Sequence, residues 1–89
     1  MISWFIFETM RENDLPTYAI VELLIRLEEH DPAIGDYKNH SIYDSGVLVK
    51  TTGGSIRFPQ SLVLQQFETP ESISENDLAR AAALFRSAN

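Results

Sequence analysis

The most regular hydrophobic pattern in the chain lies between Asp14 and His30, in the stretch DLPTYAIVELLIRLEEH. At about 100° per residue, four large aliphatic side chains share one side, as in a helix that packs on a core. These side chains are Ile20, Leu23, Leu24 and Leu27. Asp14 suits the N-cap and Pro16 the first turn, while Pro32 disfavours helical geometry in the residue before it. The pattern therefore predicts a central helix over residues 14–30.

This helix would carry a second apolar stripe, formed by Tyr18, Val21 and Ile25. A surface helix normally has one apolar side, so either another segment of the chain or a partner should cover the second stripe. The segment Ile2–Phe7, ISWFIF, is the obvious internal cover because most of its residues are large and apolar. Its own structure stays open, because a short apolar run fits a strand as well as a helix through Glu12.

A β-hairpin is predicted with strands over residues 41–52 and 55–64, because Gly53–Gly54 suits a tight turn with positive φ. Pro59 cannot donate to a β-ladder, so it marks an edge strand, a bulge or the end of a strand. A short helix over residues 59–67 is the alternative, since proline is favoured at a helix start.

The predicted turn fixes the register of the hairpin and places Lys50 opposite Arg57. One face then carries only apolar side chains and is expected to be buried; these are Val47, Val49, Ile56 and Phe58. On the exposed face, two like charges opposite each other cost roughly 0.2–1 kcal/mol unless solvent or an acid such as Asp44 or Glu68 neutralises them. Lys50 and Arg57 are therefore a candidate contact point for an anionic group of a partner.

A last helix is predicted to begin at Ser72 or Ser74, both of which have capping spacing to an acidic residue, and to run to about Ser87. Its apolar stripe would comprise Leu78, Ala81, Ala82 and Phe85. The segment 31–40, DPAIGDYKNH, is rich in turn formers and predicts a loop.

These elements predict a single α+β domain over residues 1–89. The central and C-terminal helices would pack on a small antiparallel sheet built around the β-hairpin. A chain of 89 residues has little interior volume in which to hide all of these apolar faces. We therefore predict a homodimer formed through Tyr18, Val21 and Ile25, together with part of the segment 4–7.

The charge balance narrows the classes of partner. Thirteen acids face seven bases, giving a net charge of −6, and residues 1–44 hold nine of the acids and three of the bases. An acidic chain without clustered Lys and Arg is not expected to bind nucleic acid or an anionic membrane. The segment Ile2–Phe7 is too short to span a bilayer and lacks the basic flank of a signal peptide. The absence of cysteine excludes disulfides and thiolate sites and fits a reducing compartment, so a cytoplasmic location is expected.

Candidate catalytic or metal-binding side chains gather only in the loop and its flanks; they are His30, Asp31, Asp36, His40 and Asp44. Imidazole and carboxylate groups can bind zinc or manganese, but the spacing matches no defined motif. No catalytic residue, metal site or cofactor is assigned from the sequence.

The sequence thus favours a small acidic protein-interaction module, or an inhibitor-like accessory protein, that acts by surface binding. Its partner would be another protein or a second copy of the chain. The predicted partner-binding residues are Tyr18, Val21, Ile25, Lys50 and Arg57. The alternative is a small enzyme or metal-binding protein that uses the region from His30 to Asp44.

Overall fold

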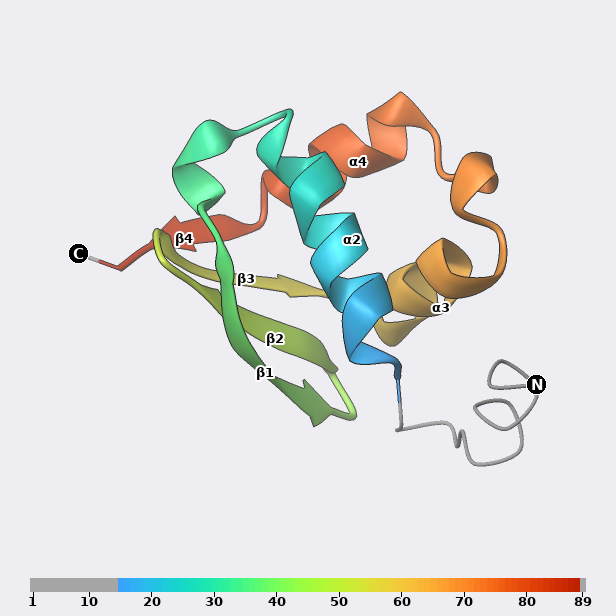
Figure 1. The fold of residues 1–89 in the computed structure, drawn as a ribbon, viewed down its shortest axis with the longest axis horizontal. Coiled ribbons are helices and arrows are strands. Elements are labelled where there is room, and N and C mark those ends of the chain that lie inside the picture. The colour runs from blue at the N-terminus through green and yellow to red at the C-terminus, as the bar shows by residue number, and fades with distance from the viewer. Residues whose placement is uncertain (1–14, 89) are drawn as a thin grey trace.

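The computed structural model describes residues 15–88 as a four-stranded antiparallel sheet with helices packed against it (Figure 1). In chain order the elements are α2 (Thr17–Glu28), η1 (Pro32–Ile34), β1 (Tyr37–Tyr43), β2 (Gly46–Thr51), β3 (Gly54–Phe58), α3 (Gln60–Glu68), η2 (Pro70–Ser72), α4 (Glu75–Ala82) and β4 (Phe85–Ser87). The strands are adjacent in the order β1-β2-β3-β4, and α3 and α4 lie in the connection between β3 and β4. The predicted α+β class, with the central and C-terminal helices on the sheet, is confirmed.

The core lies between α2 and one face of the sheet. The predicted stripe of α2 is buried, as are the inward side chains of β2 and β3, with Val47, Val49, Ile56 and Phe58 at most 1% exposed. Helix α2 begins at Thr17, and Pro16 is its N-cap with extended geometry (φ −68°, ψ 130°). The predicted cap, Asp14, lies outside the described residues. Arg26 of α2 donates to Gln66 Oε1 at 2.6 Å and to the Pro70 carbonyl at 3.0 Å, so this cation holds the helices together.

The predicted register of the β2–β3 hairpin is wrong by two residues. Lys50 faces Ser55 and Arg57 faces Leu48, so Lys50 and Arg57 are diagonal neighbours rather than direct partners. Because the error is an even number of residues, every side chain keeps its predicted face. The predicted buried face is therefore confirmed, whereas the predicted opposition of two like charges is not.

The register follows from the contacts of the glycine pair. Gly54 pairs with Thr51, so the turn residues are Thr52 and Gly53, and the Thr51 hydroxyl accepts from both glycine N–H groups at 3.2 and 3.1 Å. Gly53 donates to the Ile34 carbonyl at 3.1 Å, and a Cβ at this position would lie 1.9 Å from the Ala33 carbonyl oxygen. Gly53 is thus required by the approach of η1, and Gly54 by its φ of 152°.

The predicted loop over residues 31–40 is wrong in its second half, which belongs to β1. The predicted strand over residues 41–52 is interrupted by a turn at Asp44–Ser45, with Tyr43 and Gly46 as the closing pair. Strand β1 lies at the edge of the sheet and is mostly polar, YKNHSIY. An edge strand that buries little surface need not show the apolar alternation from which strands are predicted.

The segment after β3 takes the alternative structure. Pro59 is extended (φ −67°, ψ 148°) and caps α3, which confirms the predicted short helix and contradicts continuation of the strand to residue 64. The last helix begins after Ser74, whose hydroxyl accepts from the Asp77 N–H at 3.1 Å; the second of the two predicted caps is therefore confirmed.

The predicted extent of that last helix is wrong at its C-terminal end. Helix α4 ends at Ala82, and residues 85–87 form β4 against β3. Gly54 permits this pairing, because a Cβ there would lie 2.0 Å from the Arg86 carbonyl oxygen. Across the described stretch 15–88, no helix has the length and apolar character needed to cross a membrane.

Candidate interaction surfaces

The face of the sheet that points away from the helices is open and basic. Lys50 on β2, Arg57 on β3 and Arg86 on β4 are exposed, and pairing places Lys50 and Arg86 each opposite Ser55. Lys38, at the bulge of β1, lines a hollow together with Lys50. We call these four cations and the strand surface between them the open sheet face.

Charge is divided between the strands and the rest of the described chain. Strands β1 to β4 contain four of the six Lys and Arg residues in the range 15–88 and none of its ten Asp and Glu residues. The helices and connections hold the other two bases and all ten acids, a local charge of −8 against +4 on the strands. The net acidity of the chain therefore conceals a basic face.

No carboxylate neutralises the open sheet face among residues 15–88. The ion pairs in that range join His30 to Glu75 and Arg80 to Asp77, so neither Asp44 nor Glu68 pairs with Lys50 or Arg57. Arg57 instead donates to Ser45 Oγ at 2.9 Å and lies 5.4 Å from the centre of the Tyr43 ring. These neutral contacts hold the guanidinium in place and leave its charge uncompensated.

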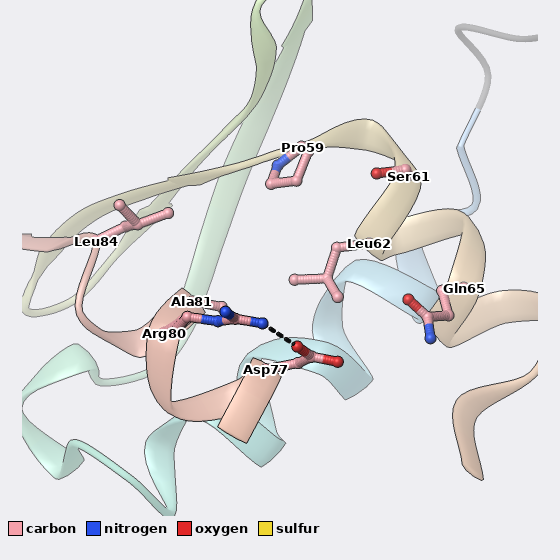
Figure 2. Close-up of a pocket in the computed structure, with 8 residues that line it drawn as sticks. All are labelled: Pro59, Ser61, Leu62, Gln65, Asp77, Arg80, Ala81 and Leu84. Atoms are coloured by element: carbon pink, nitrogen blue, oxygen red, sulfur yellow. Dashed lines mark hydrogen bonds and ion pairs between the residues drawn. The ribbon is translucent and has the colours of Figure 1, made fainter. Parts of the chain in front are cut away.

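Two hollows flank the C-terminal end of β3. One has a volume of about 320 Å³ and is lined by Ser45, Arg57, Phe58, Pro59, Leu84 and Arg86. The second, of about 300 Å³, lies between α3 and α4 (Figure 2). Pro59 and Leu84 line both hollows. Leu84 is 48% exposed, so a large apolar side chain lies on the surface beside two arginines that have no carboxylate partner among residues 15–88.

The hollow between α3 and α4 is lined on the α4 side by a salt bridge, drawn as a dashed line in Figure 2. The Arg80 guanidinium, and then the Ser74 hydroxyl, donate to the Asp77 carboxylate and lower its pKa below the ordinary value. Leu62 and Ala81 contribute an apolar lining. Because Arg80 is already paired, the unpaired positive charge beside this hollow comes from Arg57 and Arg86.

The second predicted contact surface, on α2, lies on the helical side of the molecule. Tyr18 and Ile25 are 50% and 55% exposed, and Val21 is half-buried. The Tyr18 ring meets the ring of Phe67 on α3 edge-on, with centroids 5.8 Å apart. The five predicted partner-binding residues therefore form two separate surfaces. The predicted cover of Tyr18, Val21 and Ile25 by the segment Ile2–Phe7 lies outside the described residues.

The region from His30 to Asp44 does not form one cluster. His30 at the end of α2 contacts Glu75 at 3.1 Å, whereas His40 on β1 contacts the Tyr37 hydroxyl at 2.7 Å. Asp31 caps η1 by accepting from the Ala33 N–H at 3.2 Å. In the part of the chain that the structure describes, there is no group of three or more His, Cys, Asp or Glu side chains able to hold a metal ion.

Comparison with protein-family models, curated proteins and solved structures found no match to this chain. The functional reading therefore rests on the two surfaces alone. Sequence reasoning found Lys50 and Arg57 but missed Arg86, Lys38 and Leu84. The signal for Arg86 and Lys38 appears only once the strands are paired, because the sequence pattern predicts a helix at Arg86 and a loop at Lys38. Leu84 lies beside Arg57 only through the same pairing of β4 with β3.

Proposed function

We propose that this chain is a small protein-interaction module, or an inhibitor-like accessory protein, that acts by surface binding through its open sheet face. The observation that carries the proposal is a set of four cations on strands that hold no acid, and none of the four has a carboxylate partner among residues 15–88. In a chain with a net charge of −6, strands that carry bases and no acid differ sharply from the rest of the described residues. Because the chain contains no cysteine, we place its activity in the cytoplasm, where thiols are kept reduced.

Composition favours a protein as the partner. Three exposed side chains of these types lie close together: Arg57 lies over the ring of Tyr43 and lines one hollow with Leu84. Tyr and Arg are enriched among the residues that dominate binding energy, and the centre of an interface is more apolar than its rim. Both hollows are open to solvent and mostly apolar, which suits protruding side chains of a partner better than an enclosed small substrate.

Self-association through α2 is the second proposal, favoured by the exposure of Tyr18 and Ile25 on one side of that helix. Two-fold dimers bury the same patch on both subunits, and Tyr18, Val21 and Ile25 follow one another at helical spacing along α2. This surface is separate from the open sheet face. A dimer formed through it would leave both basic faces free for other partners.

Affinity capture with matched variants tests the main proposal. The full chain and the variant Arg57→Glu/Arg86→Glu are immobilised and exposed to extract from the source cell, and Glu22→Gln/Glu29→Gln on α2 is the control. We expect a protein that is retained by the parent and the control and lost from the arginine variant. Direct binding of that purified protein is then measured by titration calorimetry. Equal retention by all three chains, or no retention, contradicts the proposal.

A further inference from the structure

We infer that the open sheet face binds an acidic peptide segment of a partner protein, in which carboxylates flank an apolar side chain. This inference rests on the proposed function and specifies the partner's chemistry. The binding element would be the hollow between Arg57 and Arg86, with Leu84 and Pro59 at its edge.

The apolar component of this site calls for an apolar side chain in the ligand. Phe58 is at most 1% exposed and contributes to the lining, while Leu84 remains 48% exposed beside it. The volume of about 320 Å³ accommodates a Leu-sized or Phe-sized group. Removing such surface from water stabilises a complex by about 25 cal/mol per Å² before the costs of association. A purely charged ligand would leave this surface exposed.

The two arginines of the hollow favour a ligand that carries a carboxylate on each side of its apolar group. Arg57 and Arg86 line the same hollow, and neither has a carboxylate partner among residues 15–88. A guanidinium binds a carboxylate through two parallel N–H···O bonds, so two arginines can fix two acids of one peptide. The Ser45 hydroxyl, which accepts from Arg57 at 2.9 Å, orients the guanidinium of Arg57.

The acids on the helical side do not prevent this binding. A helix layer is about 10 Å thick, and the Debye length at physiological ionic strength is about 8 Å. A ligand at the hollow therefore experiences mainly Arg57 and Arg86 and only a screened remainder of the charge on the helices. Asp44 lies closer, in the β1–β2 turn beside the lining residue Ser45.

A peptide fits the face better than a nucleic acid does. A nucleic-acid strand carries a phosphate about every 3.4 Å and is held by a run of cations with aromatic rings for base stacking. The open sheet face has two arginines at one hollow, and its exposed aromatic ring, Tyr43, lies under Arg57. Its apolar lining has no counterpart in a phosphate backbone.

Selection from a random dodecapeptide phage library tests the inference. The full chain serves as bait, with counter-selection on Arg57→Gln/Arg86→Gln. Selected peptides are synthesised with a fluorescent label, and their affinity is measured by anisotropy at low and physiological salt. We expect sequences with Asp or Glu on both sides of Leu, Ile, Phe or Met, with affinity at least tenfold weaker for the arginine variant.

Three single variants separate this site from general electrostatic attraction. Lys38→Gln removes one charge from the same face but outside the hollow, and we expect less than a threefold loss. Arg86→Lys keeps the charge but loses the bidentate geometry, and Leu84→Ala removes the apolar contact. Both of these should lose at least threefold while melting within a few degrees of the parent. Equal losses for Lys38→Gln and Arg86→Lys would overturn the hollow as the site.

Two competing outcomes also overturn the inference. The proposed chemistry is excluded if the selected peptides contain no acids, or if they bind Arg57→Gln/Arg86→Gln as tightly as the parent. A labelled fifteen-residue oligo(dT) that binds more tightly than the best peptide would identify a nucleic-acid surface. If either happens while the affinity-captured protein is still lost from Arg57→Glu/Arg86→Glu, the inference fails and the proposed function stands. If that protein is retained by the arginine variant, the proposed function itself fails.

Discussion

Gly53 links the hairpin turn to η1 and to the chain beyond β4, so a single methyl group added there should destabilise the fold strongly. In Gly53→Ala the new carbon would lie 1.9 Å from the Ala33 carbonyl oxygen and 2.7 Å from that of Ile34. Ordinary contact begins at 3.4 Å, so the turn and η1 must separate by more than 1 Å. That movement lengthens two backbone hydrogen bonds, Gly53 N to Ile34 O and Ala88 N to Gly53 O, both 3.1 Å.

The magnitude follows from three contributions. Overpacking costs about 1–3 kcal/mol, and each weakened hydrogen bond costs about 0.5–1.5 kcal/mol. The lower entropy of the unfolded chain offsets about 0.4–1 kcal/mol of this loss. These ranges give a net destabilisation of about 1–5 kcal/mol, and the middle value, about 3 kcal/mol, corresponds to a fall in Tm of roughly 12–24 °C.

Urea unfolding followed by far-UV circular dichroism measures the free energy of unfolding of Gly53→Ala. The matched control is Thr52→Ser in the same turn, which keeps the hydroxyl that accepts from the Asp36 N–H at 2.8 Å and should change stability by less than about 0.5 kcal/mol. A Gly53→Ala variant as stable as this control would refute the close approach of the turn to η1.

Three further changes test other parts of the structure. Val49→Asp should unfold the domain, because Val49 is fully buried and an unpaired charge would enter the core; a circular-dichroism melt like that of the parent would contradict the burial. Hydrogen bonds from Arg80 and Ser74 lower the pKa of Asp77, so its contribution to stability is present at neutral pH and is lost as the pH falls through that lowered pKa. Asp77→Asn should therefore show a smaller drop in Tm than the parent between about pH 6 and about pH 3, roughly the range in which carboxyl groups titrate. Ile25→Glu should convert the predicted dimer to a monomer with unchanged far-UV signal; light scattering that gives 10.1 kDa for the parent would exclude the dimer, and unfolding of the variant would exclude Ile25 as a surface residue.

The parts of the fold that could be predicted from sequence are those with strong local signals. Helix α2 has a full apolar stripe, and the faces of β2 and β3 follow from the alternation of their side chains. Turn position was harder to predict, because Gly53–Gly54 fits two adjacent two-residue turns equally well. The choice between them depends on the Thr51 hydroxyl, which accepts from both glycines, and on η1, whose Ile34 carbonyl accepts from Gly53.

Strand β4 explains why the candidate site was only half predicted. Its three residues, Phe85–Ser87, follow an alanine-rich helix without a glycine or proline to mark the boundary, and the spacing of Phe85 from Leu78 continues the helical stripe. Pairing with β3 outweighs that local preference, because it satisfies backbone groups of both strands along the edge. Only this pairing brings Arg86 beside the hollow that Arg57 lines. A sequence can therefore indicate that Arg57 is exposed on a strand, but the second arginine of the site is created by a long-range contact, and with it the two-carboxylate chemistry that we infer for the ligand.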